Sequence, residues 1–222
     1  MARPVSVTRR PEIVDGLRRV LMAQGLVLPS NDVIAQEASM SRQLIRHYFP
    51  EQRDMALALC RSLASGYQEL LTEGVSQSGS ISRLSGFLDF YFGIAAEGWP
   101  DKPRDDQAYD ALFSLAAGDA ELKELLKGQY DLLASVLSHE LCVTYPSLPV
   151  EAAKELALII VSMMYGHWKM VCSLGFDEKQ NKAMRECVDR LIQSYVAIPP
   201  DRERSEAVDE PADAGGPNDL PR

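Results

Sequence analysis

Apolar residues recur every three or four positions along most of this chain, which is the pattern of amphipathic helices. The sequence has no convincing run of alternating polar and apolar residues and no Asn-Gly or Asp-Gly hairpin signal. The pattern therefore predicts an all-α fold, with helices over about 11–24, 31–38, 42–48, 51–73, 83–97, 105–117, 120–144, 150–174 and 178–197.

The first three predicted helices are short and have clear boundary signals. Gly25 is placed to stop the first helix. Ser30 and Ser41 stand at the N-cap positions of the second and third helices, and residues 39–40 between those helices fit a tight turn. Pro50 suits the first position of the long fourth helix. Three such helices describe a helix-turn-helix unit.

The third helix carries side chains suited to the edges of DNA bases. Leu44 and Ile45 would anchor it from behind, and Ser41 would present a hydroxyl and unpaired N–H groups to a phosphate. The alternative is a solvated amphipathic helix, which does not explain the serine cap, the short length and the aromatic end together. Arginine and glutamine pair with guanine and adenine edges, and the outward residues are Arg42, Gln43, Arg46 and His47.

Charge is distributed unevenly along a chain whose formal net charge is -9. Residues 1–61 hold nine arginines and six acidic residues, so this segment is about +3 and the remainder about -12. A basic end on an acidic body favours a module that binds polyanions. The alternative is that +3 reflects ordinary surface.

Residues 12–60 resemble the DNA-binding domain of the tetracycline-repressor (TetR) family. The resemblance rests on Gly25 after the first helix, Ser30 before the second, the pair Ile34-Ala35, and the junction HYFPEQRDMAL at 47–57. It implies a regulator that binds operator DNA. Base edges would be read by Arg42, Gln43, Arg46 and His47, phosphates would be held by Ser30, Ser41, Tyr48 and Arg53, and an N-terminal arm would offer Arg3, Arg9 and Arg10.

Several positions depart from the family pattern. The family usually has glycine in the turn, where this chain has Ser39, and often lysine where it has Gln52. The neighbouring Arg53 is then expected to take over the phosphate contact. Gln43 and Arg46 replace a small residue and an aromatic one. These changes alter which operator is read more than whether DNA is bound.

The chain is expected to divide at residue 50. Residues 1–50 would form the DNA-binding domain, and 51–198 a helical ligand-binding and dimerisation domain with 51–73 as a linking helix. Residues 199–222, acidic and rich in proline and glycine, are expected to be disordered. Residues 163–180 resemble the Gly-x-Trp helix of the choline-responsive branch, which implies a homodimer through the last two helices. The alternative is a helical hairpin buried within one subunit.

Large side chains in the acidic part are candidates for a ligand pocket. Each could equally be ordinary core. The shortage of charge around residues 87–99 favours an apolar or aromatic ligand. The candidates are Phe87, Tyr91, Trp99, Tyr109, Phe113, Tyr130, Met163, His167 and Trp168.

Other chemistry finds little support in the sequence. The four cysteines show no C-x-x-C spacing, and the pairs His139/Cys142 and His167/Cys172 do not converge, so we expect no metal and no cofactor. No nucleophile elbow or phosphate loop indicates an enzyme. No apolar run reaches about 18 residues and no secretory signal is visible, which favours a cytoplasmic protein without a membrane span.

These observations predict a homodimeric repressor that a small molecule releases from a pseudo-palindromic operator. Two alternatives remain open. One is a regulator of this fold that acts as an activator or answers to a protein partner. The other is a helical carrier or enzyme whose basic head is incidental.

Overall fold

The computed structural model describes residues 5–25, 28–77, 82–95 and 98–197, and every regular element within those ranges is a helix. The predicted all-α fold is confirmed. The elements are α1 (Val5–Gln24), α2 (Asn31–Glu37), α3 (Arg42–Tyr48), α4 (Gln52–Gln77), α5 (Arg83–Tyr91), α6 (Asp106–Ala116), α7 (Ala120–Thr144), α8 (Val150–Trp168), η1 (Lys169–Ser173) and α9 (Gln180–Ala197).

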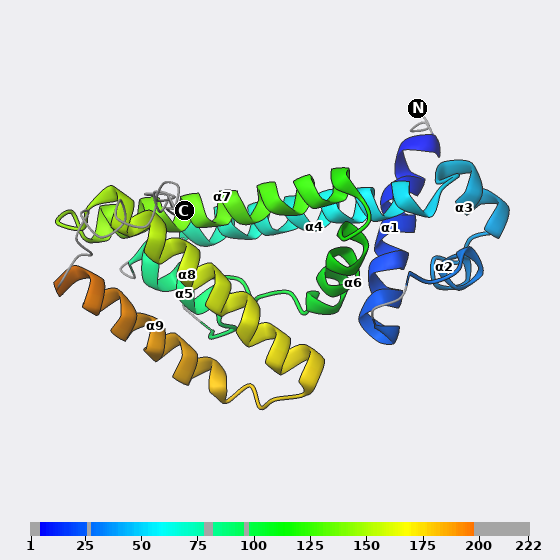
Figure 1. Ribbon diagram of the computed structural model, residues 1–222. Helices are drawn as coiled ribbons and strands as arrows, with labels where there is room; N and C mark the ends of the chain where they lie inside the picture. Colours follow the sequence, from blue (N-terminus) through cyan, green and yellow to red (C-terminus); the bar gives the residue numbers. More distant parts are fainter. Residues whose placement is uncertain (1–4, 26–27, 78–81, 96–97, 198–222) are drawn as a thin grey trace, which may run out of the picture.

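Helices α1, α2 and α3 form a small head at one end of an elongated molecule (Figure 1). Their apolar stripes meet in a core that includes Leu17, Ile34 and Ile45, each at most 1% exposed. Gly16 lets α1 and α2 approach closely, because a Cβ atom there would lie 3.1 Å from the Cβ of Ala38. The short α2 and α3 therefore owe their stability to shared packing rather than to length.

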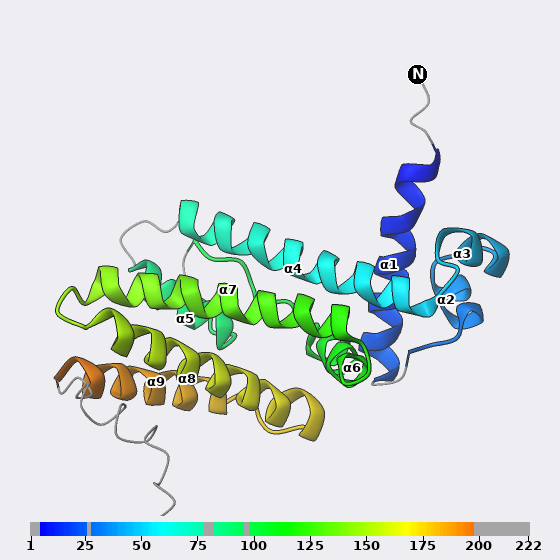
Figure 2. The same cartoon turned by 45° about the horizontal axis from the view of Figure 1, so that its top comes forward.

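The body consists of layered helices. Helix α4 leaves the head and runs beside α7, and α8 and α9 lie on the other side of α7 (Figures 1 and 2). Helices α4 and α7 are tied by Gln129, whose Nε2 donates to the carbonyl oxygen of Cys60 at 3.1 Å. Helices α8 and α9 are tied by the Tyr195 hydroxyl, which donates to Glu155 at 2.8 Å.

The apolar core of the head does not stop at the junction with the body. The same buried cluster continues through the first half of α4 into α6 and the start of α7, where Ala108, Leu112 and Leu122 are at most 1% exposed. A second cluster fills the remainder of the body between α5, α7, α8 and α9. Helix α6 therefore packs on the head although it lies beyond residue 50, where the chain was expected to divide.

Several helix boundaries differ from the predicted ones. Helix α1 begins at Val5, six residues earlier than expected, and keeps Pro11 inside it. Helix α4 continues to Gln77, past Gly74, and α5 stops at Tyr91 rather than near residue 97. Gly93, with φ of +65°, follows that end. The expected tail 199–222 lies outside the described residues, as do residues 78–81 between the fourth and fifth predicted helices.

Helix α8 does not run straight to residue 174 as predicted. It changes at Lys169 into a five-residue π-helical turn, η1. Within the described residues, one helical run, Val150–Ser173, is long and apolar enough to cross a membrane, judged by length and composition only. Of the tested window of that run, 39% is buried inside the protein. Core helices of globular proteins share that composition. Here the inner face, with Leu156 and Ile160 fully buried, packs into the body.

Candidate nucleic-acid interface and ligand cavity

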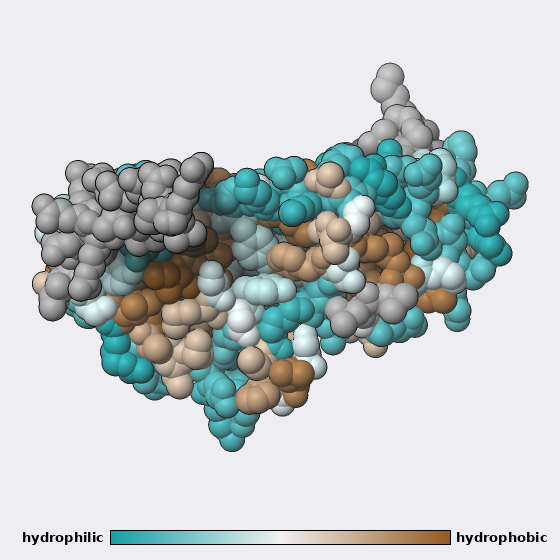
Figure 3. All heavy atoms as spheres, viewed as in Figure 1, coloured by the Kyte–Doolittle hydropathy of each residue, from teal (hydrophilic) through white to brown (hydrophobic). Residues whose placement is uncertain are grey.

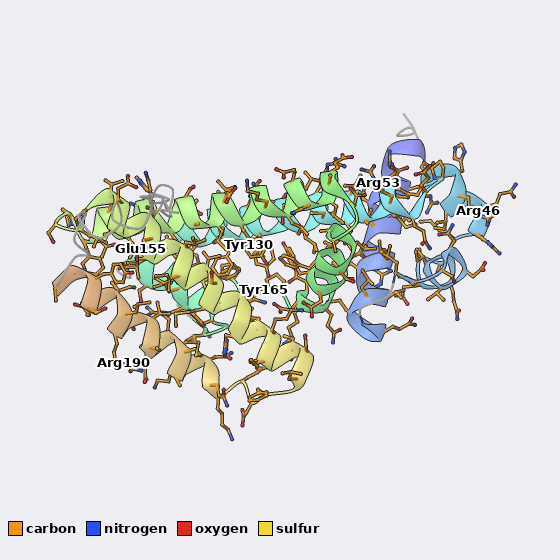
Figure 4. All side chains as sticks on the ribbon, in the orientation of Figure 1. Arg46, Arg53, Tyr130, Glu155, Tyr165 and Arg190 are labelled. Carbon is orange, nitrogen blue, oxygen red and sulfur yellow. The ribbon has the colours of Figure 1, made fainter. Side chains whose placement is uncertain are left out.

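Helix α3 is held so that its polar face points away from the molecule. Ser41 is its N-cap, and the Ser41 side chain accepts a hydrogen bond from the Leu44 amide at 3.2 Å, as predicted. Ile45 is buried beneath it. The outer surface of the head is mostly hydrophilic (Figure 3), and Arg46 projects from its edge (Figure 4). The exposed residues of α3 are Arg42, Gln43, Arg46 and His47, while Tyr48 is half-buried.

The turn before α3 requires an unusual backbone conformation. Ser39 has φ of +52°, in the left-handed region that favours glycine. The turn is closed by the Met40 amide, which donates to the carbonyl oxygen of Ala35 at 2.9 Å. The geometry explains why glycine is usual at this position in the family that the sequence resembles.

Residues of the head that were predicted to contact DNA lie in different surroundings. Ser30 stands at the start of α2 in extended conformation, but its side chain makes no capping hydrogen bond there. Arg42 Nη1 lies 3.2 Å from Asp32 of α2. Arg42 and Asp32 border a shallow depression of the head. The depression is also lined by Ser30, Asn31, Arg46, Pro50 and Gln52.

Arg53 is paired with the body. Its guanidinium donates to Asp119 at 2.5 Å and to Glu121 at 2.7 Å, at the start of α7. The hydrogen bonds that Arg53 donates to Asp119 and then to Glu121 raise the pKa of Arg53, and Arg53 in turn lowers the pKa of both carboxyl groups. Asp119 also caps α7 by accepting from the Leu122 amide. The arginine expected to hold a phosphate thus joins the first turns of α4 and α7.

The arginines of the expected N-terminal arm belong in part to α1. Arg9 donates to Glu12 at 2.7 Å. The guanidinium of Arg10 lies over the ring of Phe49, 4.5 Å from its centroid. Arg3 lies outside the described residues.

A cavity of about 680 Å³ lies between α4, α6, α7 and α8. Tyrosines from five helices form much of its wall, and Tyr130 of α7 and Tyr165 of α8 face the interior between their helices (Figure 4). Burial raises the pKa of Tyr91, Tyr109 and Tyr130, so these hydroxyls stay neutral at physiological pH. The aromatic residues of the wall are Tyr67, Tyr91, Tyr109, Tyr130, Tyr165 and Trp168.

Four of the nine predicted pocket residues lie on this wall, namely Tyr91, Tyr109, Tyr130 and Trp168. The other five do not. Met163 and Phe87 pack in or against the body core. Phe113 packs behind Tyr130 and Tyr165, with ring centroids 5.5 and 5.0 Å away.

Trp99 and His167 also pack in the interior of the protein and do not line the cavity. The indole of Trp99 is wedged between Gly74 of α4 and Gly86 of α5, where a Cβ atom at either glycine would lie within 2.5 Å of the ring. His167 is 5% exposed, and its Nε2 lies 2.8 Å from Oδ1 of Asn181 on α9. Both are packing residues, because neither reaches the wall.

A polar strip at one end of the cavity was not predicted from the sequence. Lys102 Nζ lies 2.7 Å from Asp106, and Lys169 Nζ pairs with Asp110. The π turn brings Ser173 to Asp110 as well, with its hydroxyl donating at 2.7 Å. Asp106 and Asp110 are one turn apart on α6, a spacing that the sequence does contain. Lys102 lies only four residues before Asp106, but Lys169 comes from a distant segment, so spacing alone could not reveal the strip.

Asp105, just before α6, is the most perturbed carboxyl group near the cavity. It is 3% exposed and accepts a hydrogen bond from the Tyr67 hydroxyl at 2.9 Å. Burial raises its pKa to about 6, although Lys102 and the Tyr67 hydrogen bond oppose that rise. No group of three or more His, Cys, Asp or Glu side chains able to hold a metal occurs within the described part of the chain.

Comparison with known proteins finds similar sequences and folds. No family model matches the chain. A TetR-like transcriptional regulator from Rhodococcus sp. RHA1 has the same fold, with a TM-score of 0.59 and 18% identity, over 89% of this chain and all of that one. The resemblance to TetR-type transcriptional regulators is therefore confirmed.

Two further proteins relate the chain to a branch of that class. The HTH-type transcriptional regulator BetI of Vibrio campbellii (strain ATCC BAA-1116) is 27% identical over 197 residues, 86% of this chain and 95% of BetI. A protein from Saccharomonospora viridis, described as a transcriptional regulator and solved in complex with choline, matches with a TM-score of 0.69. Its identity is 18%, over 84% of this chain and 96% of that one. The resemblance to the choline-responsive branch is thus also supported by sequence and fold.

Proposed function

We propose that this protein is a cytoplasmic, homodimeric repressor that binds a pseudo-palindromic operator and is released by a small molecule bound in the tyrosine-lined cavity. The observation that carries the proposal is a helix-turn-helix head whose exposed α3 residues are base-reading types, joined by one buried core to a wall of that cavity. DNA contacts would then respond to whatever fills the cavity.

Base reading is assigned to the outer face of α3. Arg42, Gln43, Arg46 and His47 are exposed, and none of them is needed to build the core of the head. The Asp32 carboxylate beside Arg42 limits its rotamers and would orient it for a groove. A good bidentate contact to a base is worth about 1–3 kcal/mol of discrimination.

The homodimer is supported by large apolar residues that are exposed on α8 and the segment after it. Leu158 is 62% exposed and Val150 58% exposed, although α8 also buries a full inner face. Met170 in the π turn, and Leu174 and Phe176 after it, are exposed apolar residues as well. Val150 and Leu158 lie among the exposed polar residues Glu151, Lys154 and Glu155, so only part of this face is apolar. Large apolar side chains left exposed in this way favour a surface that a partner covers. A twofold mate would cover this face and place two α3 helices about 34–36 Å apart, one turn of DNA.

Signal transmission is assigned to α6. One side of α6 gives Asp106, Tyr109 and Asp110 to the cavity. Its other side gives Ala108 and Leu112 to the core shared with the head. A ligand that binds one tilt of α6 more tightly than another would shift the spacing of the two heads. The differential affinity for the two arrangements sets how far the equilibrium moves.

The DNA-binding assignment is tested by gel shift on the region upstream of the protein's own gene. The double variant Arg42→Ala with Arg46→Ala should lose sequence preference while keeping its helical content. The control, Lys123→Ala with Lys127→Ala, removes the same charge from exposed positions on α7. Operator affinity that survives in the first variant would show that α3 is not the reading helix.

A further inference from the structure

The carboxylate of Asp32 faces the same depression of the head as two arginines of α3. Asp32 Oδ2 lies 3.2 Å from Arg42 Nη1, and Arg46 borders the depression as well. Within the described part of the chain, Asp32 is the only acidic residue that lines it. Ser30, a predicted phosphate ligand, lies on the same rim. A duplex that is read by α3 and held at Ser30 would therefore bring phosphates close to this carboxylate.

A carboxylate at such a place opposes DNA binding. A DNA duplex carries one negative charge for about every 1.7 Å of its axis. The Asp32 side chain is 60% exposed and that of Arg42 is 52% exposed, so neither is needed to fill the core of the head. An ion pair this exposed also contributes little to folding stability. The position of Asp32 is better explained by its effect on a bound duplex.

The other acidic residues of α1 and α2 that the structure describes are paired away from α3. Each forms an ion pair with an arginine of α1. Glu37, the last residue of α2, accepts a hydrogen bond from Arg19 at 2.6 Å. The remaining two are Glu12, which pairs with Arg9, and Asp15, which pairs with Arg18 and Arg19. Asp32 is therefore the acidic residue of these helices whose partner is an arginine assigned to base reading.

Arg42 can hold Asp32 and a base at the same time. A guanidinium has five N–H donors in a planar fork. Nη1 of Arg42 faces Asp32, whereas its Nε and Nη2 have no hydrogen-bond or ion-pair partner among the described residues. That free edge offers two donors, which match O6 and N7 of guanine in the major groove. A guanine can thus be bound without separating the pair, whereas a phosphate beside the pair meets a charge that is already neutralised.

We propose that Asp32 is a specificity-determining residue of the head. Its carboxylate repels duplexes of unrelated sequence, and operator DNA overcomes this repulsion through a guanine that Arg42 binds while paired with Asp32. The positive charge of Arg42 is thereby reserved for base reading and withheld from phosphates. Each half of the operator should carry a guanine at the position that faces Arg42. This inference rests on the proposed DNA-binding function and adds the base that is read and the residue that enforces the reading.

Fluorescence anisotropy with two duplexes of equal length tests this role. One is the operator located by footprinting in the region upstream of the protein's own gene, and the other has a scrambled sequence. Asp32→Asn should bind the scrambled duplex roughly fivefold more tightly, with a salt slope steeper by about 1 per subunit, because Arg42 is released to the phosphates. The ratio of operator affinity to scrambled-duplex affinity should fall roughly tenfold.

Two variants serve as controls. Glu37→Gln removes the same charge at the other end of α2 and leaves Arg42 paired, so both duplexes are affected alike. Its affinity ratio should stay within about twofold of the wild type. Asp32→Glu keeps the charge and should keep most of the discrimination.

A second measurement alters the DNA. Replacing operator guanines one at a time by 7-deazaguanine removes the N7 acceptor and keeps the base pair. The wild type should lose roughly tenfold in affinity at one guanine of each half-site. Arg42→Ala should show no loss at that guanine, and Asp32→Asn a loss of at most about threefold. If Asp32→Asn does not fold, as judged by circular dichroism, Asp32→Ser replaces it.

Two results overturn the inference: an unchanged affinity ratio in Asp32→Asn, or losses at every 7-deazaguanine position that are the same in the wild type and in Arg42→Ala. Binding of the upstream region by the wild type is the separate test of the proposed function. Operator binding with an unchanged ratio in Asp32→Asn removes only the role of Asp32. If the wild type does not bind the upstream region, the proposed function fails and the role of Asp32 fails with it.

Discussion

At the residue scale, one serine holds the helix-turn-helix in a conformation that costs free energy. A non-glycine residue in the left-handed region costs about 1 kcal/mol or more, and Ser39 has φ of +52°. Ser39→Gly should therefore raise the free energy of unfolding by about 0.5–1 kcal/mol, after the added chain entropy of glycine is subtracted. Urea denaturation at a fixed protein concentration measures it.

The control for that change is Ser39→Ala. Alanine keeps the steric cost of a Cβ atom and loses the hydroxyl, so no gain is expected. An alanine variant as stable as the glycine variant would mean that the backbone conformation at residue 39 is not the source of the strain.

Asp105 makes stability depend on pH in an unusual direction. Burial raises its pKa in the folded protein to about 6 from an ordinary value near 4, so the folded state binds more protons than the unfolded state between those values. Stability contributed by this group therefore falls as pH rises through that window, by about 2–3 kcal/mol in total. Above about pH 6, the full destabilisation caused by the buried, ionised Asp105 is present.

Asp105→Asn removes this titration and should be more stable than the wild type at pH 7.5, with the difference vanishing near pH 4. The Asn oxygen can still accept the Tyr67 hydroxyl. Thermal unfolding across pH 4–8 measures the effect, and the exposed Asp101→Asn serves as the control. A constant difference between Asp105→Asn and wild type across that range would contradict a buried, titrating carboxyl.

At the scale of elements, the first turns of α4 and α7 are joined through Arg53. If Arg53 also meets a DNA phosphate, Arg53→Ala should weaken binding to operator and to unrelated duplex by the same factor. The slope of log affinity against log salt should fall by about 1 per subunit. Fluorescence anisotropy at several salt concentrations measures both quantities.

Arg61→Ala is the matched control, because Arg61 shares Glu121 with Arg53 at 3.0 Å but lies two turns further along α4. An unchanged salt slope in Arg53→Ala would assign this guanidinium wholly to the link between α4 and α7.

Sequence patterns predicted the elements well and the cavity only in part. The periodicity that defined α7 gave its observed bounds, and Ser41 was recognised as a cap because capping is local in the chain. The cavity depends on pairs from distant segments, such as Lys102 with Trp168, which no local pattern contains. Trp99 was misassigned because large aromatic residues look alike in sequence whether they fill a core or border a cavity.

At the scale of the whole molecule, the outer face of α8 predicts association. Leu158→Asp places a charge in the centre of the proposed dimer surface and should convert the dimer to monomers in sedimentation velocity. Operator affinity should fall with it, since two half-sites are then read separately. Leu158 is fully outside both buried cores, so the fold of the subunit should persist.

Val143→Asp is the control for this variant. Val143 is 49% exposed near the end of α7, and its replacement should leave the dimer intact. If Leu158→Asp sediments as a dimer while Val143→Asp does not, the subunits meet through another surface.

The buried cluster that runs from the head into α6 and α7 also limits how this protein can be engineered or recombined. A fragment ending at residue 50 would expose the apolar sides of Phe49 and Ile13 to water, since Met55, Leu59 and Leu112 cover the same cluster. A chimaera that joins this DNA-binding head to a different ligand-binding domain must also include the beginning of α4, the whole of α6 and the first turns of α7. Swapping specificity by exchanging α3 surface residues alone avoids that constraint.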